Sequence, residues 1–131
     1  MRRHKAVRPT QAALAVLLTI LGVVACYGAE DTTFHAAPAA AAAVKNPYQS
    51  SAAAATAGKK LYGQNCAQCH GNNLQGMGPA PALDTPTIKA AKPGELYWFI
   101  STGNVAKGMP SWSGLPKQQR WQMVTFLQMK H

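Results

Sequence analysis

Two cysteines and a histidine stand close together in the stretch Cys66-Ala67-Gln68-Cys69-His70-Gly71. Thiols three positions apart lie on one side of a helical turn, so they can act on the same group. A redox pair of the thioredoxin kind belongs in a βαβ unit, but no strand pattern precedes Cys66. A structural zinc site needs four ligands, while Cys26 and the remaining histidines lie outside this region or at its end. A Cys66–Cys69 disulfide would be strained and would leave His70 without a role.

The pattern Cys-x-x-Cys-His is the attachment motif of c-type haem. Each thiol can add to one vinyl group on the same edge of the porphyrin, and the next residue then falls below the iron. The motif therefore predicts one haem c, bound covalently through Cys66 and Cys69, with an imidazole nitrogen of His70 as an iron ligand.

A methionine is the expected second axial ligand, because electron carriers often use Met to raise the haem potential. The candidates downstream of the motif are Met77, Met109, Met123 and Met129. Met77 lies only seven residues after His70 and is too near to cross the haem plane, while the last two fall in a helical pattern. Met109 lies 39 residues after His70, in a loop that Pro110 makes rigid. We therefore expect Met109 to be the ligand.

The elements that must position these residues are predicted to be helices. The first spans 52–65 and runs into the haem motif, a second spans 94–102 and stops at Gly103, and the last spans 116–130. A short turn is expected at 86–90, capped by Thr85 and begun by Pro86. The apolar residues of the last helix form a wide stripe, and two polar residues, Arg120 and Gln128, interrupt it.

The N-terminal quarter of the chain has a different composition. Arg2, Arg3, Lys5 and Arg8 precede 14 mostly apolar residues at 12–25, which is the pattern of a secretory signal peptide. The sequence Val-Val-Ala-Cys at 23–26 resembles a bacterial lipobox, which would place a lipid on Cys26. Ordinary cleavage after Ala25 or near Gly28 is the alternative.

Residues 26–56 are interpreted as an Ala/Pro-rich flexible tether. Positions 36–57 contain 12 alanines in 22 residues. Alanine buries little area, so such a segment does not offset its ordering entropy. The domain organisation expected from the sequence is a signal peptide at 1–25, a tether at 26–56 and a haem domain at 57–131.

The haem domain resembles a class I monohaem cytochrome c. The resemblance covers residues 57–131 and rests on Gly58, Tyr62, Cys66, Cys69, His70, the Gly-Pro-Ala-Pro-Ala-Leu stretch at 78–83, Gly108-Met109-Pro110 and residues 121–127. It implies an all-α fold of three main helices plus loops around one covalent haem.

The resemblance also implies several contacts. Gly58 would admit Phe126 where the two terminal helices cross. A backbone carbonyl in Pro81-Ala82-Leu83, with Pro79 as the alternative, would hold the second ring nitrogen of His70. Trp112 would flank the methionine loop and shield the haem.

An iron with both axial positions filled has no open site for a substrate, so we expect a one-electron carrier rather than an enzyme. A carrier of this kind in the periplasm resembles the cytochromes or cytochrome domains of the respiratory chain that serve quinoprotein dehydrogenases or terminal oxidases. Two alternatives remain: a five-coordinate haem protein that binds a gas or peroxide, and a cytochrome subunit fixed to a larger oxidoreductase.

The charge balance of the haem domain predicts its partners. Residues 57–131 contain eight basic side chains, Lys59, Lys60, Lys89, Lys92, Lys107, Lys117, Arg120 and Lys130. Only Asp84 and Glu95 oppose them, so partners with acidic docking surfaces are expected. Charged residues are only 13% of the whole chain, which argues against nucleic-acid binding. Contact with a membrane is expected only through a lipid on Cys26.

Overall fold

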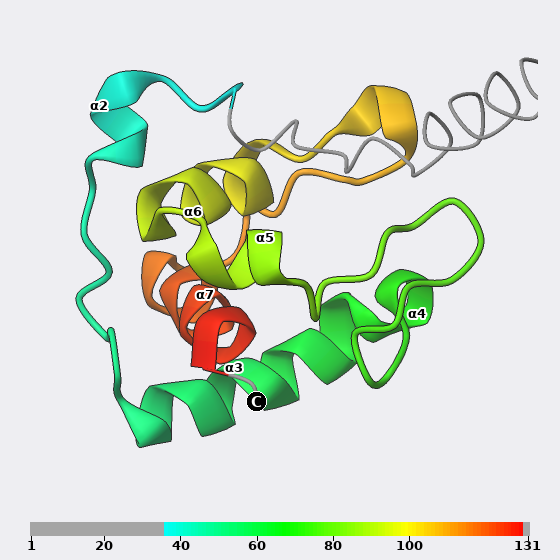
Figure 1. Cartoon of the computed structure of the whole chain (residues 1–131), viewed down its shortest axis with the longest axis horizontal. Helices are drawn as coiled ribbons and strands as arrows, with labels where there is room; N and C mark the ends of the chain where they lie inside the picture. Colours follow the sequence, from blue (N-terminus) through cyan, green and yellow to red (C-terminus); the bar gives the residue numbers. More distant parts are fainter. Residues whose placement is uncertain (1–35, 130–131) are drawn as a thin grey trace, which may run out of the picture. The chain divides into compact units, whose positions relative to one another are not determined.

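The computed structural model describes residues 36–129, and within them it is built from helices (Figure 1). The expected signal peptide and Cys26 lie outside the described residues. In chain order the helices are α2 (Ala39–Ala42), α3 (Ala52–Asn65), α4 (Ala67–His70), α5 (Pro86–Ala90), α6 (Pro93–Thr102) and α7 (Lys117–Met129), with a 3-10 turn η3 (Val105–Lys107) before α7. The described residues form no strand beyond isolated bridges, so the all-α prediction is confirmed. None of these helices is long and apolar enough to cross a membrane.

The predicted helix bounds are confirmed to within a residue, and local capping explains them. The side chain of Ser51 accepts a hydrogen bond from the Ala54 amide at the start of α3. Thr85 caps α5 in the same way through the Ile88 amide, and Pro86 follows it. Helix α7 begins at Lys117 rather than at residue 116, because Pro116 supplies the carbonyl that accepts from the first turn.

Helices α3 and α7 cross at Gly58. A Cβ atom on Gly58 would lie 2.9 Å from the Cβ of Phe126 and 2.6 Å from the carbonyl carbon of Gln122. The ring of Phe126 packs against that of Tyr62, one turn along α3, with 5.5 Å between centroids. The expected pairing of Gly58 with Phe126 is therefore confirmed.

The core is formed by the buried face of α7 together with apolar residues of the other helices and loops that pack against it. Its buried apolar members are Tyr62, Ala67, Leu74, Ile88, Ala91, Leu96, Ile100, Trp121, Met123, Val124, Phe126 and Leu127. Arg120 and Gln128, which interrupt the apolar stripe, are accommodated by hydrogen bonds. Arg120 Nε donates to the carbonyl of Leu115, and Gln128 Nε2 donates to that of Ala91.

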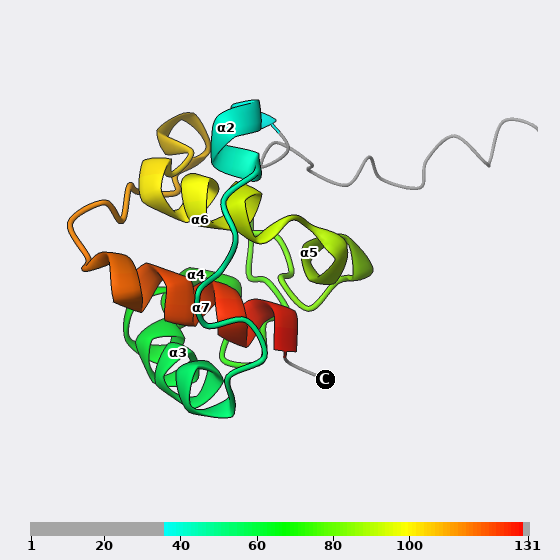
Figure 2. The same ribbon diagram turned by 90° about the vertical axis from the view of Figure 1, so that its left-hand side faces the viewer.

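The described part of the expected tether packs against the domain. Residues 36–51, here called the strap, run past α6 and α7 before α3 begins (Figures 1 and 2). Asn46 is buried and its Nδ2 donates to Thr125 Oγ1 on α7, at 2.9 Å. Tyr48 packs against the core, and its carbonyl accepts from the same hydroxyl. Two non-alanine residues thus hold a segment that composition alone predicts to be flexible, and α3 begins before the expected boundary at 57.

The close crossing at Gly58 leads to a testable prediction about the stability of the domain. Gly58→Ala places a methyl group into the Gln122 carbonyl, so we expect the free energy of unfolding to fall by about 1–3 kcal/mol. Gly63→Ala, on the same helix, is the control, because a Cβ atom there would have nothing within 4 Å. It should raise stability by up to about 1 kcal/mol. Guanidinium unfolding of the haem-loaded variants measures both changes, and equal losses would contradict the prediction.

Candidate haem site

The Cys-x-x-Cys-His motif occupies the junction between two helices. Cys66 ends α3 and begins α4, because its amide donates to the Tyr62 carbonyl and its own carbonyl accepts from the His70 amide at 2.9 Å. Both thiols are free, with Cys66 half-buried and Cys69 exposed. Burial, helped by the neighbouring Cys69, raises the pKa of the Cys66 thiol to about 11, so in the haem-free chain it stays protonated near neutral pH. The motif residues therefore share one turn, as their spacing predicts.

A tyrosine on α3 holds the end of this turn in place. Tyr62 is buried, and its hydroxyl donates to the carbonyl of Gly71 at 2.6 Å. Gly71 has φ of +78°, which ends α4 directly after His70. Burial raises the pKa of Tyr62 to about 12, with a smaller contribution from Cys66. The sequence singles out Tyr62 as one of the residues that carry the cytochrome c resemblance, but it does not predict this hydrogen bond, because a bond across nine residues has no local pattern.

The loop between α4 and α5 brings a carbonyl to His70. The Pro81 carbonyl oxygen lies 2.9 Å from His70 Nδ1, which is the contact expected for Pro81 rather than Pro79. A carbonyl can only accept, so Nδ1 carries the proton in this contact and Nε2 keeps its lone pair for a metal.

Leu74 fixes the shape of that loop. Its side chain is fully buried, and its carbonyl accepts from the Leu83 amide at 2.7 Å. Gly76 has φ of +78°, and a Cβ atom there would lie 2.9 Å from the carbonyl carbon of Pro81. The approach of the proline segment to His70 therefore depends on a glycine and on one buried leucine.

Met109 is held at the far end of α6. Its amide and carbonyl exchange two backbone hydrogen bonds with Asn104, at 3.0 and 2.9 Å. Gly103 and Gly108, both with positive φ, allow the chain to fold back on either side. In Figure 1 this segment, drawn in gold, and α4 both lie on the side of α6 remote from α2. Met77 is 53% exposed in the other loop, and Met123 is buried in the core.

Trp112 secures the methionine loop from its other end. Its amide donates to the Ile100 carbonyl at 3.1 Å, and its half-buried side chain packs against the core. The neighbouring Ser111 hydroxyl donates to the Ser101 carbonyl at 2.6 Å. The segment that carries Met109 is thus joined to the last turns of α6 at several points.

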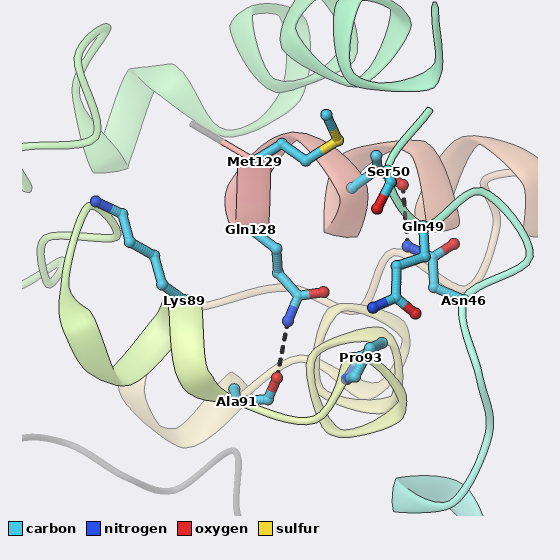
Figure 3. Close-up of a pocket in the computed structure, with 9 residues that line it drawn as sticks. Asn46, Gln49, Ser50, Lys89, Ala91, Pro93, Gln128 and Met129 are labelled. Atoms are coloured by element: carbon cyan, nitrogen blue, oxygen red, sulfur yellow. Dashed lines mark hydrogen bonds between the residues drawn. The ribbon is translucent and has the colours of Figure 1, made fainter. Parts of the chain in front are cut away.

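A polar cavity of about 330 Å³ lies elsewhere on the domain (Figure 3). Asn46, Gln49 and Ser50 of the strap and Gln128 of α7 contribute to its lining, and Gln128 reaches across to the Ala91 carbonyl. None of the motif cysteines, His70 or Met109 lines it, so this cavity is separate from the candidate haem site.

The donor set fits haem c. Two free thiols on one turn suit two vinyl groups, and His70 presents Nε2 while its other nitrogen is held by Pro81. A thioether sulfur lies on a separate, well-tethered loop at Met109. Nitrogen and thioether ligands of this kind are those that hold haem iron in c-type cytochromes.

Comparisons with known proteins agree with this chemistry. Residues 53–127 match the family described as cytochrome c oxidase, cbb3-type, subunit III. A 75-residue segment is 36% identical to the cbb3-type cytochrome c oxidase subunit CcoP of Azospirillum brasilense, covering 52% of this chain and 25% of that relative. The chain therefore spans about a quarter of the length of this curated relative.

A solved structure shares the fold. Cytochrome CL of the marine methylotrophic bacterium Methylophaga aminisulfidivorans MPT superposes with a TM-score of 0.54 at 22% identity, over 95% of this chain and 68% of that one. At this identity the likeness concerns the fold, which is that of a cytochrome c.

The hydrogen bond from Tyr62 to Gly71 leads to a testable prediction about how stability depends on pH. A phenol whose pKa is raised from 10.0 to about 12 adds stability that is complete below pH 10 and is lost as pH rises through 12. Tyr62→Phe should lower the free energy of unfolding by about 1 kcal/mol at pH 8, where the hydrogen bond is intact. The difference between the two proteins should shrink between pH 10 and 12. A difference that stays constant over that range in denaturant titrations would refute the assignment.

Proposed function

Since this chain belongs to the family of cytochrome c oxidase, cbb3-type, subunit III, we propose that it is a periplasmic one-electron carrier whose haem is ligated by His70 and Met109. It is a c-type cytochrome that transfers electrons. The finer proposal is that it passes electrons from a dehydrogenase or other donor to an oxidase or other acceptor.

The observation that carries this proposal is the His70 Nδ1 to Pro81 contact of 2.9 Å, made on the turn that holds both thiols. Haem c, when bound, supplies an iron that gains and loses one electron. Cys66 and Cys69 would hold the group covalently, and the Pro81 carbonyl would fix the ring of His70 and make Nε2 a better donor. Met109 would close the second axial position, and Trp112 would support its loop.

The acidic residues of the described chain support a carrier role. Asp84 forms a 2.7 Å ion pair with Lys89. Glu95 accepts from the Lys92 amide at the start of α6. Both carboxylates thus have structural roles, and His70 has its Nδ1 held by a carbonyl. These positions favour electron transfer over general acid or base chemistry.

Replacing the proposed sixth ligand tests the function. In Met109→Leu the ferric protein should lose the weak long-wavelength charge-transfer band of Met ligation, and the ferrous protein should bind carbon monoxide. Its reduction potential should fall, because Met ligation raises the haem potential. Met77→Leu is the matched control, since Met77 is exposed in the other loop, and it should behave as the unmodified protein. Carbon monoxide binding by the unmodified protein would instead indicate a five-coordinate haem.

A role as a subunit fixed to a larger oxidoreductase is the second candidate. The similarity to CcoP, which is named as an oxidase subunit, supports it. The two forms differ in assembly, because a fixed subunit co-purifies with its complex under mild conditions while a mobile carrier is isolated as a stable monomer.

Export and anchoring complete the proposal. We propose that residues 1–25 are removed and that Cys26 carries a lipid. The first buried residue of the strap is Ala42, which lies 16 positions after Cys26. Sixteen residues span at most about 58 Å, which sets the greatest height of the domain above the membrane surface if Cys26 carries a lipid.

Mass spectrometry of the mature protein checks these assignments together. The expected mass is that of a chain beginning at Cys26, increased by one haem and by a diacylglycerol group with its N-acyl chain. A chain that begins near Gly28 without lipid would rule out the anchor, and a haem lost under denaturing conditions would rule out covalent attachment.

A further inference from the structure

An apolar groove lies between the strap and α6, apart from the candidate haem site. Its volume is about 330 Å³. The residues that line it are Ala41 and Val44 of the strap, Gly94, Tyr97, Trp98 and Ser101 of α6, and Lys117 and Arg120 of α7. Figures 1 and 2 show α2 lying against α6, and Figure 1 shows α4 on the opposite side of that helix. We name this feature the α2–α6 groove.

The groove depends on close contact between two backbones. A Cβ atom on Gly94 would lie 2.9 Å from the carbonyl oxygen of Val44 and 3.0 Å from that of Ala42, and it would also clash with Ala41. The strap can therefore approach α6 only because residue 94 has no side chain. Val44 remains 49% exposed at the mouth of the groove, although it is aliphatic. An exposed aliphatic side chain beside half-buried Tyr97 and Trp98 provides apolar surface for a partner.

One end of the groove carries positive charge. Arg120 is only 8% exposed, and its described partners are neutral: the Leu115 carbonyl, the Ser101 hydroxyl and the ring of Tyr97, 4.8 Å from the guanidinium. Lys117, one turn earlier on α7, is exposed at the rim. A guanidinium held in an apolar setting gains most from a carboxylate, because the low local dielectric strengthens their attraction.

We propose that the α2–α6 groove binds an acidic segment of a partner protein, in which an apolar side chain fills the groove and an adjacent carboxylate meets Lys117 and Arg120. Charge complementarity favours this occupant, because residues 36–129 contain eight basic and two acidic side chains. The inference rests on the proposed role as a fixed subunit. A partner seated here would contact the strap, α6 and the start of α7, whereas none of Cys66, Cys69, His70 and Met109 lines the groove.

The test is a nuclear magnetic resonance titration of the haem-loaded protein with the peptide acetyl-Glu-Phe-Glu-amide. We expect shifts centred on Val44, Trp98 and Ser101. Two control peptides test the two parts of this recognition. One has Gln in place of both Glu residues and lacks the carboxylates, and the other has Ala in place of Phe and lacks the large apolar side chain. Each should bind at least about tenfold more weakly than the parent peptide.

Variants of the protein complete the test. Val44→Asp and Lys117→Glu should each weaken binding of the peptide by about tenfold, since each places a carboxylate where the peptide's apolar or acidic group would lie. Lys60→Glu is the control, because it makes the same charge change at an exposed position of α3, and it should alter binding by less than about twofold. Circular dichroism establishes that each variant is folded.

Several results would overturn the proposal. The first is binding of the Gln control peptide as tightly as the parent peptide, and the second is a set of shifts centred on residues 104–112. The third is tighter binding of dodecanoate than of the peptide. The last is a change in the signals of residues 30–35 when the peptide binds. The third would assign the groove to a lipid, and the last to this chain's own N-terminal segment. The peptide assay uses no electron transfer. If the unmodified ferric protein lacks the methionine charge-transfer band but still binds the peptide, the proposed ligation is refuted and the groove proposal stands.

Discussion

The close crossing of α3 and α7 is the contact on which the rest of the domain depends. Gly58 lets the Gln122 carbonyl and Phe126 approach the backbone of α3, and this places Tyr62 against Phe126. A domain of this size has a thin core, so the packing of two helices at backbone distance supplies much of its order. The same helix that makes this crossing ends at Cys66, and the crossing therefore positions the first residue of the haem motif.

The site is assembled from the crossing outward. Tyr62 reaches Gly71 and fixes the end of α4, and the loop beyond it returns Pro81 to His70. On the other side, α6 packs against α7 and carries the methionine loop at its C-terminal end. Each segment that carries a proposed ligand is thus joined by hydrogen bonds to a helix that contributes to the core.

The strap extends this arrangement on the opposite face. Alanine-rich composition predicts a flexible segment, yet Asn46 and Tyr48 secure it to α7, and Gly94 admits it to α6. Its packing against α6 creates the α2–α6 groove. The hydrogen bond between Asn46 and Thr125 joins residues that are 79 positions apart, so the composition of the segment does not predict it.

The local features of this protein can be predicted from its amino-acid sequence. The haem motif, the proposal of Met109 as a ligand, the helix ends at Thr85 and Gly103 and the pairing of Gly58 with Phe126 all follow from spacing, capping residues or family resemblance, which are readable over a few positions or a known pattern. The contacts between residues far apart in the chain can be seen only in the folded domain. The Tyr62 bond to Gly71, the docking of the strap and the neutral surroundings of Arg120 depend on which helix faces meet, and that is a property of the packed core rather than of any short segment.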